Sequence, residues 1–161
     1  MIHVRCARLA TRVVKNHWDR TILQKISIDE IRDFLTQDQV QNLTQDGATK
    51  FHFWGDTDAT LAKTKGIETG EDIIFYGENS FHLKAKAGAV FINEQLAKYF
   101  WSSTDGGLAW KNIYALEEVK DLSIVYKASD RKGKDKYYFL DSNKTSKELK
   151  WTPKNKLIFL Q

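Results

Sequence analysis

The segment from Phe81 to Phe91 constrains the fold most, because apolar and polar positions alternate along it. The apolar positions are Phe81, Leu83, Ala85, Ala87, Ala89 and Phe91, and the polar residues His82, Lys84 and Lys86 lie between them. Alternation over this length predicts a strand with one buried face. That face is mostly alanine, with Gly88 among its residues, so the strand can bend and pack closely, as in a small barrel.

The residues before this strand predict a strand, a helix and a second strand in close succession. Residues 51–54 form a short apolar strand that ends in Trp54, and a polar turn begins at Gly55. A helix then contains Leu61, and residues 72–76 read as a strand that a tight turn joins to the alternating segment. The large flat ring of Trp54 therefore lies beside exposed backbone and polar groups. Such a site suits a planar, hydrogen-bonding ligand such as a nucleobase.

The remaining segments predict an α+β fold. Strands are expected within residues 2–14 and at 110–116, 122–126, 137–140 and 157–160, and helices at 28–45 and 93–101. The charged residues 127–136 are expected to form a hairpin tip or loop, and the polar stretch after 140 is compatible with a helix. We therefore predict one domain over residues 1–161. Its curved sheet or pseudo-barrel has about six strands, flanked by two or three helices.

Composition excludes several classes of protein. The 161 residues are 42% hydrophobic and 29% charged, which is typical of a globular chain and not of a disordered one. Cys6 is the only cysteine, so neither an internal disulfide nor a multi-cysteine zinc site can form. No segment approaches the roughly 20 apolar residues that span a bilayer. A cytoplasmic protein is expected, and the net charge of +4 suits an anionic partner without requiring one.

Residue patterns for catalysis are weak. The four histidines have no metal-ligand spacing, the glycines are too scattered to hold a phosphate, and no GxSxG motif occurs. The nearest pattern to a nuclease is Asp141 with Glu148 and Lys150, which would bind magnesium if the carboxylates converged. We expect no catalytic residues, no metal and no cofactor, and keep a small magnesium-dependent nuclease as an alternative.

Aromatic residues are more informative than the acidic ones. Among five tryptophans, Trp54, Trp101 and Trp110 lie near the ends of predicted elements. A base that stacks on such a ring gains about 1–3 kcal/mol, and two facing rings can hold a base that has left the duplex. The alternative is that each tryptophan is a core or rim residue, which is the expectation for Trp18 and Trp151.

Two sets of motifs resemble the YTH/EVE group of PUA-like domains. The first is Phe53-Trp54-Gly55-Asp56, a short helix, and then Gly70-Glu71-Asp72-Ile73-Ile74-Phe75-Tyr76-Gly77. The second is LAKYFW, followed by WKNIYALEEVKDLSI. The likeness covers residues 50–125 and is greatest to the amino-terminal DNA-reading domains of McrB-type, modification-dependent restriction systems. Gly-Asp-Thr replaces the Ser-Thr run of RNA-reading YTH domains, which favours the DNA-reading version.

The resemblance implies a pseudo-barrel that flips a modified base, 6-methyladenine or 5-methylcytosine, into an aromatic cage. Trp54 and Trp101 would be the walls of this cage, Gly55 and Asp56 would read the edge of the base, and Tyr76 would line the site. Basic residues would hold the DNA phosphates, namely Arg12, Lys15, Lys84, Lys86, Arg131, Lys132 and Lys134. The expected partners are DNA with a modified base and the NTPase and nuclease domains or subunits of a restriction system. An RNA-binding PUA-like or YTH-like reader is the other alternative.

Overall fold

The computed structural model of this chain describes residues 2–63, 66–78, 80–102, 110–129, 136–140, 146–152 and 156–159. From residue 123 onward it describes only the course of the strands. The described strands are β1 (Ile2–Cys6), β2 (Ile26–Ser27), β3 (Lys50–Asp56), β4 (Asp72–Gly77), β5 (Ser80–Ile92), β6 (Asn112–Ser129), β7 (Lys136–Leu140), β8 (Ser146–Thr152) and β9 (Lys156–Phe159). The helices are α1 (Arg12–Thr21), α2 (Ile28–Ile31), α3 (Gln37–Thr44), α4 (Asp58–Lys63) and α5 (Glu94–Phe100), with a 3₁₀ turn at Arg32–Phe34.

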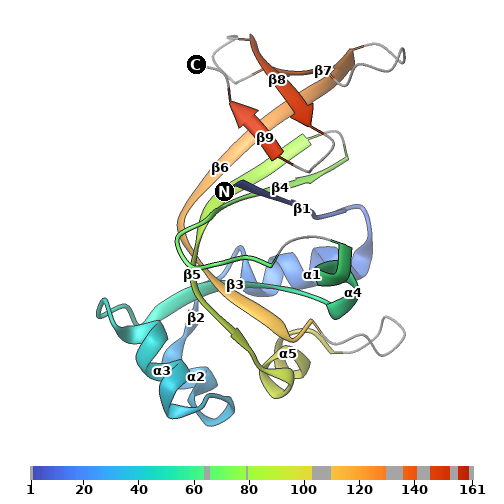
Figure 1. Cartoon of the computed structure of the whole chain (residues 1–161). Helices are drawn as coiled ribbons and strands as arrows, with labels where there is room; N and C mark the ends of the chain where they lie inside the picture. Colours follow the sequence, from blue (N-terminus) through green and yellow to red (C-terminus); the bar gives the residue numbers. More distant parts are fainter. Residues whose placement is uncertain are drawn as a thin grey trace.

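The strands form a mixed sheet in the order β1-β4-β5-β6-β7-β8-β9, in which β1 runs parallel to β4 and the other neighbours are antiparallel. Strand β3 pairs with the first part of β6 and also with the short β2. The register between β5 and β6 shifts at three places, and such irregularities bend a strand. Figure 1 shows β5 and β6 as long curved strands, with α2, α3 and α5 near one end and β7, β8 and β9 near the other. The predicted α+β fold with a curved sheet is confirmed.

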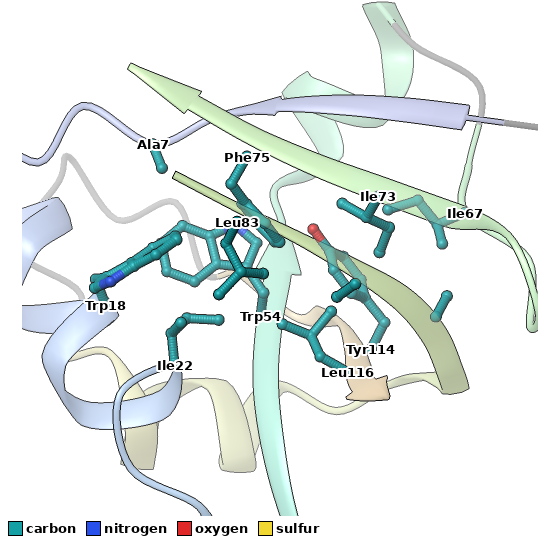
Figure 2. Packing of buried hydrophobic residues seen from close by; sticks show 12 residues of the cluster. Ala7, Trp18, Ile22, Trp54, Ile67, Ile73, Phe75, Leu83, Tyr114 and Leu116 are labelled. Atoms are coloured by element: carbon teal, nitrogen blue, oxygen red, sulfur yellow. The ribbon is translucent and has the colours of Figure 1, made fainter. Parts of the chain in front are cut away.

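Two hydrophobic cores lie on opposite faces of β3 and β6. Successive residues of a strand point to opposite faces, so Trp54 and Tyr114 enter one core while Phe53 and Ala115 enter the other. Helix α1 covers the first core with Trp18, and Figure 2 shows this ring with Trp54, Phe75 and Tyr114. Helices α2, α3 and α5 cover the second core. This arrangement places Trp54 inside the protein and not at its surface.

Three expectations about the elements were wrong. The two strands expected at 110–116 and 122–126 are one strand, β6, because Glu117, Lys120 and Asp121 between them still pair with β5. The polar stretch after residue 140 contains β8 and no described helix, since pairing with β7 and β9 keeps its backbone extended despite polar side chains. The strand expected within residues 2–14 is present, but it ends at Cys6, so Arg12 and Lys15 lie on α1. Part of the expected loop at 127–136 is strand, because β6 continues to Ser129.

Candidate functional site

Three tryptophans meet at the end of β3. Trp54 lies on the strand, Trp101 at the C-cap of α5, and Trp110 just before β6. The centroid of Trp54 is 6.3 Å from that of Trp101 and 5.2 Å from that of Trp110, and Trp101 and Trp110 are 5.9 Å apart. We call these three residues the tryptophan cluster. Trp54 and Trp101 are 2% and 4% exposed, whereas Trp110 is partly exposed.

Gly55 makes this close approach possible. A Cβ atom at this position would lie 2.6 Å from the Trp110 carbonyl oxygen and 2.9 Å from Cζ3 of Trp101. The ring of Trp101 therefore passes over the backbone of β3 and reaches Trp54 on the other side of the strand. The sequence assigned Gly55 to base reading, and the structure gives it a packing role that any side chain would disturb.

Helix α1 holds Trp101 in place from the other side. The Trp101 indole Nε1–H donates a hydrogen bond to Thr21 Oγ1 at 3.4 Å, and the Thr21 hydroxyl donates to the His17 carbonyl at 3.0 Å. The His17 ring also packs edge-on against Trp110, with centroids 4.8 Å apart. Two members of the tryptophan cluster thus contact the helix that carries Arg12 and Lys15.

The rings of Trp54 and Trp101 are not arranged as parallel walls. Their planes are inclined by 62° at a centroid distance of 6.3 Å. A base held between two rings needs walls about 7 Å apart and nearly parallel, because each stacking contact takes about 3.5 Å. The cluster is packed as a hydrophobic core is packed, and it can admit a base only if a ring moves. The role of Trp54 and Trp101 in holding a base therefore remains a prediction.

Asp56 is buried in an ion pair. Arg5 Nε donates to both carboxylate oxygens of Asp56, at 2.8 and 3.1 Å, and each residue is 5% exposed. Burial raises the pKa of Asp56, and the positive charge and hydrogen bonds of Arg5 offset that rise only in part. The carboxylate that the sequence assigned to reading a base edge is thus held by a partner on β1.

Arg5 and Tyr114 complete this polar group, and the sequence reasoning missed both. Tyr114 lies opposite Trp54 on β6 and is 2% exposed. Its hydroxyl and the Nη2 atom of Arg5 are both buried, and a hydrogen bond from Arg5 lowers the pKa of Tyr114 without offsetting the effect of burial. Burial and the Asp56 charge raise the pKa of Tyr114 far above its ordinary value, so its hydroxyl keeps its proton. The available signal was the alternation in IHVRC, which places His3 and Arg5 on one face of β1.

The other predicted base-binding residue, Tyr76, is partly exposed on β4. Its ring lies near that of Phe81, with centroids 6.3 Å apart, whereas its neighbour Phe75 packs against Trp54 at 5.6 Å. Consecutive strand residues point to opposite faces, which directs Tyr76 away from the tryptophan cluster. Of the five predicted base-binding residues, the structure brings Trp54, Gly55 and Trp101 into contact. It places Asp56 beside Arg5 and Tyr76 beside Phe81.

Four of the predicted phosphate-binding residues lie in the described part. Arg12 is exposed on α1, and Lys15 pairs there with Asp19 at 2.5 Å. Lys84 lies 3.4 Å from Asp72, and Lys86 lies 2.9 Å from Glu118. These lysines already have acidic neighbours, which a phosphate must compete with. Arg131, Lys132 and Lys134 lie outside the described residues.

Within the described residues, no group of three or more His, Cys, Asp or Glu side chains converges as a metal site would require. Glu148 and Lys150 of the alternative nuclease pattern lie on β8, and Asp141 lies outside the described residues. In the described part, no helix has the length and apolar character needed to cross a membrane.

Several hollows are lined by described residues. One of ≈ 260 Å³ lies beside Asp56 and Tyr114. A hollow of ≈ 570 Å³ lies between α1 and β5, lined by Trp18, Leu23 and His82 among others. A third, ≈ 510 Å³, lies near His52 and Glu117. The first of these lies on the face of the sheet that carries Trp54.

Comparison with solved structures relates this fold to a DNA-bound protein. The chain is similar to the N-terminal domain of Thermococcus gammatolerans McrB bound to m5C DNA, with a TM-score of 0.57 and 14% identity over 75% of each chain. Neither a scan of protein-family models nor a search of curated proteins gave a match. At this identity the likeness shows the fold, and it confirms the predicted resemblance to McrB-type amino-terminal domains at the level of fold.

Proposed function

We propose that this chain is a DNA-binding module that recognises a methylated base after the base has flipped out of the duplex. The observation that carries the proposal is the fold it shares with an McrB domain bound to m5C DNA. Because one fold can serve many functions, the site must support the proposal as well. The tryptophan cluster does so, since it gathers three large aromatic faces at one end of β3.

The tryptophan cluster has to open for a base to enter between Trp54 and Trp101. Trp54 is packed between Trp18 and Phe75, so we expect Trp101 to turn toward a plane parallel to Trp54, which breaks its 3.4 Å hydrogen bond to Thr21. Trp110 is partly exposed and moves aside to make room. Stacking gains of about 1–3 kcal/mol per ring would then offset an unstacking cost of a few kcal/mol.

The remaining predicted contacts follow from this arrangement. A carboxylate has about four lone-pair sites, so Asp56 can accept a hydrogen bond from a base while it stays paired with Arg5. The phosphates would be contacted by basic residues, namely Arg12, Lys15, Lys84, Lys86, Arg131, Lys132 and Lys134.

We propose no catalytic activity for this chain. Cleavage would then belong to NTPase and nuclease domains or subunits that act with it in a restriction system.

The first prediction concerns preference for methylated DNA. Equilibrium binding should be measured on duplexes of one sequence carrying 5-methylcytosine, 6-methyladenine or no modification, and on the matching RNA. Each good base contact is worth about 1–3 kcal/mol. We therefore expect roughly tenfold or greater preference for one methylated DNA, with affinity falling steeply as salt rises. Equal affinity for all DNA duplexes would rule out the proposed function, and tighter binding to RNA would favour the RNA-reading alternative.

Two variants separate a base-holding tryptophan from a structural one. Trp54→Phe and Trp18→Phe each shorten a buried ring of the first core, and both parent residues are nearly unexposed. We expect similar losses of stability but reduced preference for methylated DNA only in Trp54→Phe. Equal preference in the two variants would remove Trp54 from the site.

Adding magnesium to the wild-type samples tests the alternative that the chain is a nuclease. DNA cleavage that depends on magnesium and is abolished by Glu148→Ala would favour that function.

A further inference from the structure

Two exposed apolar side chains lie at the end of β5. Val90 and Ile92 are 38% and 67% exposed, and with Leu23 they are the large apolar side chains that the described residues expose most. Both line the ≈ 260 Å³ hollow beside Asp56 and Tyr114. They are two residues apart on one strand, so they share a face and form a small apolar patch. We call Val90 and Ile92 the β5 apolar pair.

The register of the strands places this pair on the face of the sheet that carries Trp54. Val90 pairs with Tyr114 on β6, and Tyr114 pairs with Trp54 on β3. Residues directly opposite each other on neighbouring antiparallel strands share one face. Neighbouring strands lie about 4.8 Å apart, so two strand spacings, about 10 Å, separate Val90 from Trp54. This separation corresponds to about three base-pair steps of DNA.

The pair also lies beside the opening of the tryptophan cluster. Trp110, the partly exposed ring that moves aside for a base, directly precedes Lys111. The backbone N–H of Asn93, next to Ile92, donates to the Lys111 carbonyl at 2.9 Å. The carbonyl of Ile92 accepts a hydrogen bond from Gln39 Nε2 at 3.2 Å. The backbone that carries Ile92 is therefore fixed close to the ring that has to move.

The charges near the pair favour apolar contact over phosphate binding. Lys111 Nζ lies 2.9 Å from Asp58 Oδ2, and Lys98 Nζ lies 2.9 Å from Glu94 Oε1. These lysines already have acidic partners, so the surroundings of the pair carry little net charge. A stable protein interface buries about 800 Å² on each partner, far more than two side chains expose. The size and polarity of the patch thus suit the apolar faces of DNA bases.

We propose that Ile92, with Val90 beside it, inserts into the base stack of the duplex next to the flipped base. The inference rests on the proposed function and names the residues that contact the DNA from which the base has left. A base that leaves the duplex gives up its stacking on the neighbouring bases. In proteins that kink DNA, apolar side chains such as isoleucine enter between base steps. Ile92 suits this role because its branched side chain is stiff and its backbone is held by Gln39.

The experiment measures equilibrium binding of wild type, Ile92→Ala and Ile92→Leu to two DNAs. One is a duplex with the methylated base that wild type prefers, 5-methylcytosine or 6-methyladenine. The other carries the same base in a single-stranded overhang, where no intact stack can receive a side chain. Ile92→Ala should bind the duplex roughly tenfold more weakly than wild type, and the overhang at most about threefold more weakly. Ile92→Leu keeps an apolar side chain and should stay within about threefold of wild type on both DNAs.

Leu23→Ala is the matched control. Leu23 is 65% exposed, close to the 67% of Ile92, but it follows α1 and lines the ≈ 570 Å³ hollow. Leu23→Ala should bind both DNAs as wild type does. Because both residues are largely exposed, both alanine variants should melt near the temperature of wild type, which shows that a loss of binding is not a loss of folding.

The outcomes separate this inference from the proposed function. If wild type prefers methylated DNA but Ile92→Ala binds the methylated duplex as tightly as wild type, Ile92 does not enter the stack and the proposed function stands. Equal losses of Ile92→Ala on the duplex and on the overhang would also overturn the inference, because the contact would then not depend on a stack. No wild-type preference for any methylated duplex would overturn both.

Discussion

Replacing Asp56 with alanine is expected to lower the free energy of unfolding by about 3–5 kcal/mol, because it leaves the Arg5 charge buried without a partner. Both residues are 5% exposed, and the Arg5 Nε–H donates to both carboxylate oxygens. Urea unfolding followed by circular dichroism gives the change, provided that the dependence on denaturant keeps its slope.

The control for Asp56→Ala is an exposed pair on α1. Lys15 and Asp19 are 57% and 41% exposed, and such pairs contribute about 0–1 kcal/mol, so Asp19→Ala should change little. The double variant Arg5→Leu/Asp56→Leu should recover much of the stability lost in Asp56→Ala, since it removes both charges. A loss below about 1 kcal/mol in Asp56→Ala would contradict a buried, mutually dependent pair.

Gly55→Ala is expected to destabilise the protein by about 1–3 kcal/mol through overpacking. The added Cβ would lie 2.6 Å from the Trp110 carbonyl oxygen, and a backbone atom cannot move aside as a side chain can. The change should also separate Trp101 from Trp54, which near-ultraviolet circular dichroism of the tryptophans would detect.

Gly66→Ala is the matched control for Gly55→Ala. An added Cβ there meets nothing within 4 Å, so the substitution should be neutral or should stabilise by about 0.4–1 kcal/mol through the unfolded chain. Equal effects of the two substitutions would show that the close approach of Trp101 and Trp110 to β3 does not limit packing.

The strands were predictable because the alternation of apolar and polar residues shows which face of a strand is buried. Phe81, Leu83, Ala85 and Ala87 are all buried on β5, as the segment from Phe81 to Phe91 predicts. That residues 112–129 form one strand, β6, was not predictable, because the mostly charged segment 117–121 looks like a break until β5 is known to pair with it. Local sequence also gives no sign that β8 is a strand, since its neighbours β7 and β9 impose that conformation.

The site was harder to predict than the fold, because its contacts join distant parts of the chain. Alternation assigns Trp54 to a face, but its depth depends on α1 and on Trp18. Arg5 lies in the predicted first strand, but its burial depends on Asp56, which a sequence pattern does not link to it. Tyr114 lies opposite Trp54 only because β3 pairs with β6. The order of the aromatic residues along the chain indicated which of them could form a site, but it did not give the angles between their rings.

The pairing of β3 with β6 also bears on how the chain reaches its fold. Trp54 pairs with Tyr114, and Ile2 of β1 pairs with Asp72 of β4, so both ends of the described core depend on contacts between residues far apart in sequence. Contacts of this kind slow folding, since a long loop must close before they form. Until β6 is present, β3 has only the two-residue β2 as a partner and leaves Trp54 uncovered on that side. During synthesis, β3 is therefore exposed to misassociation until β6 pairs with it.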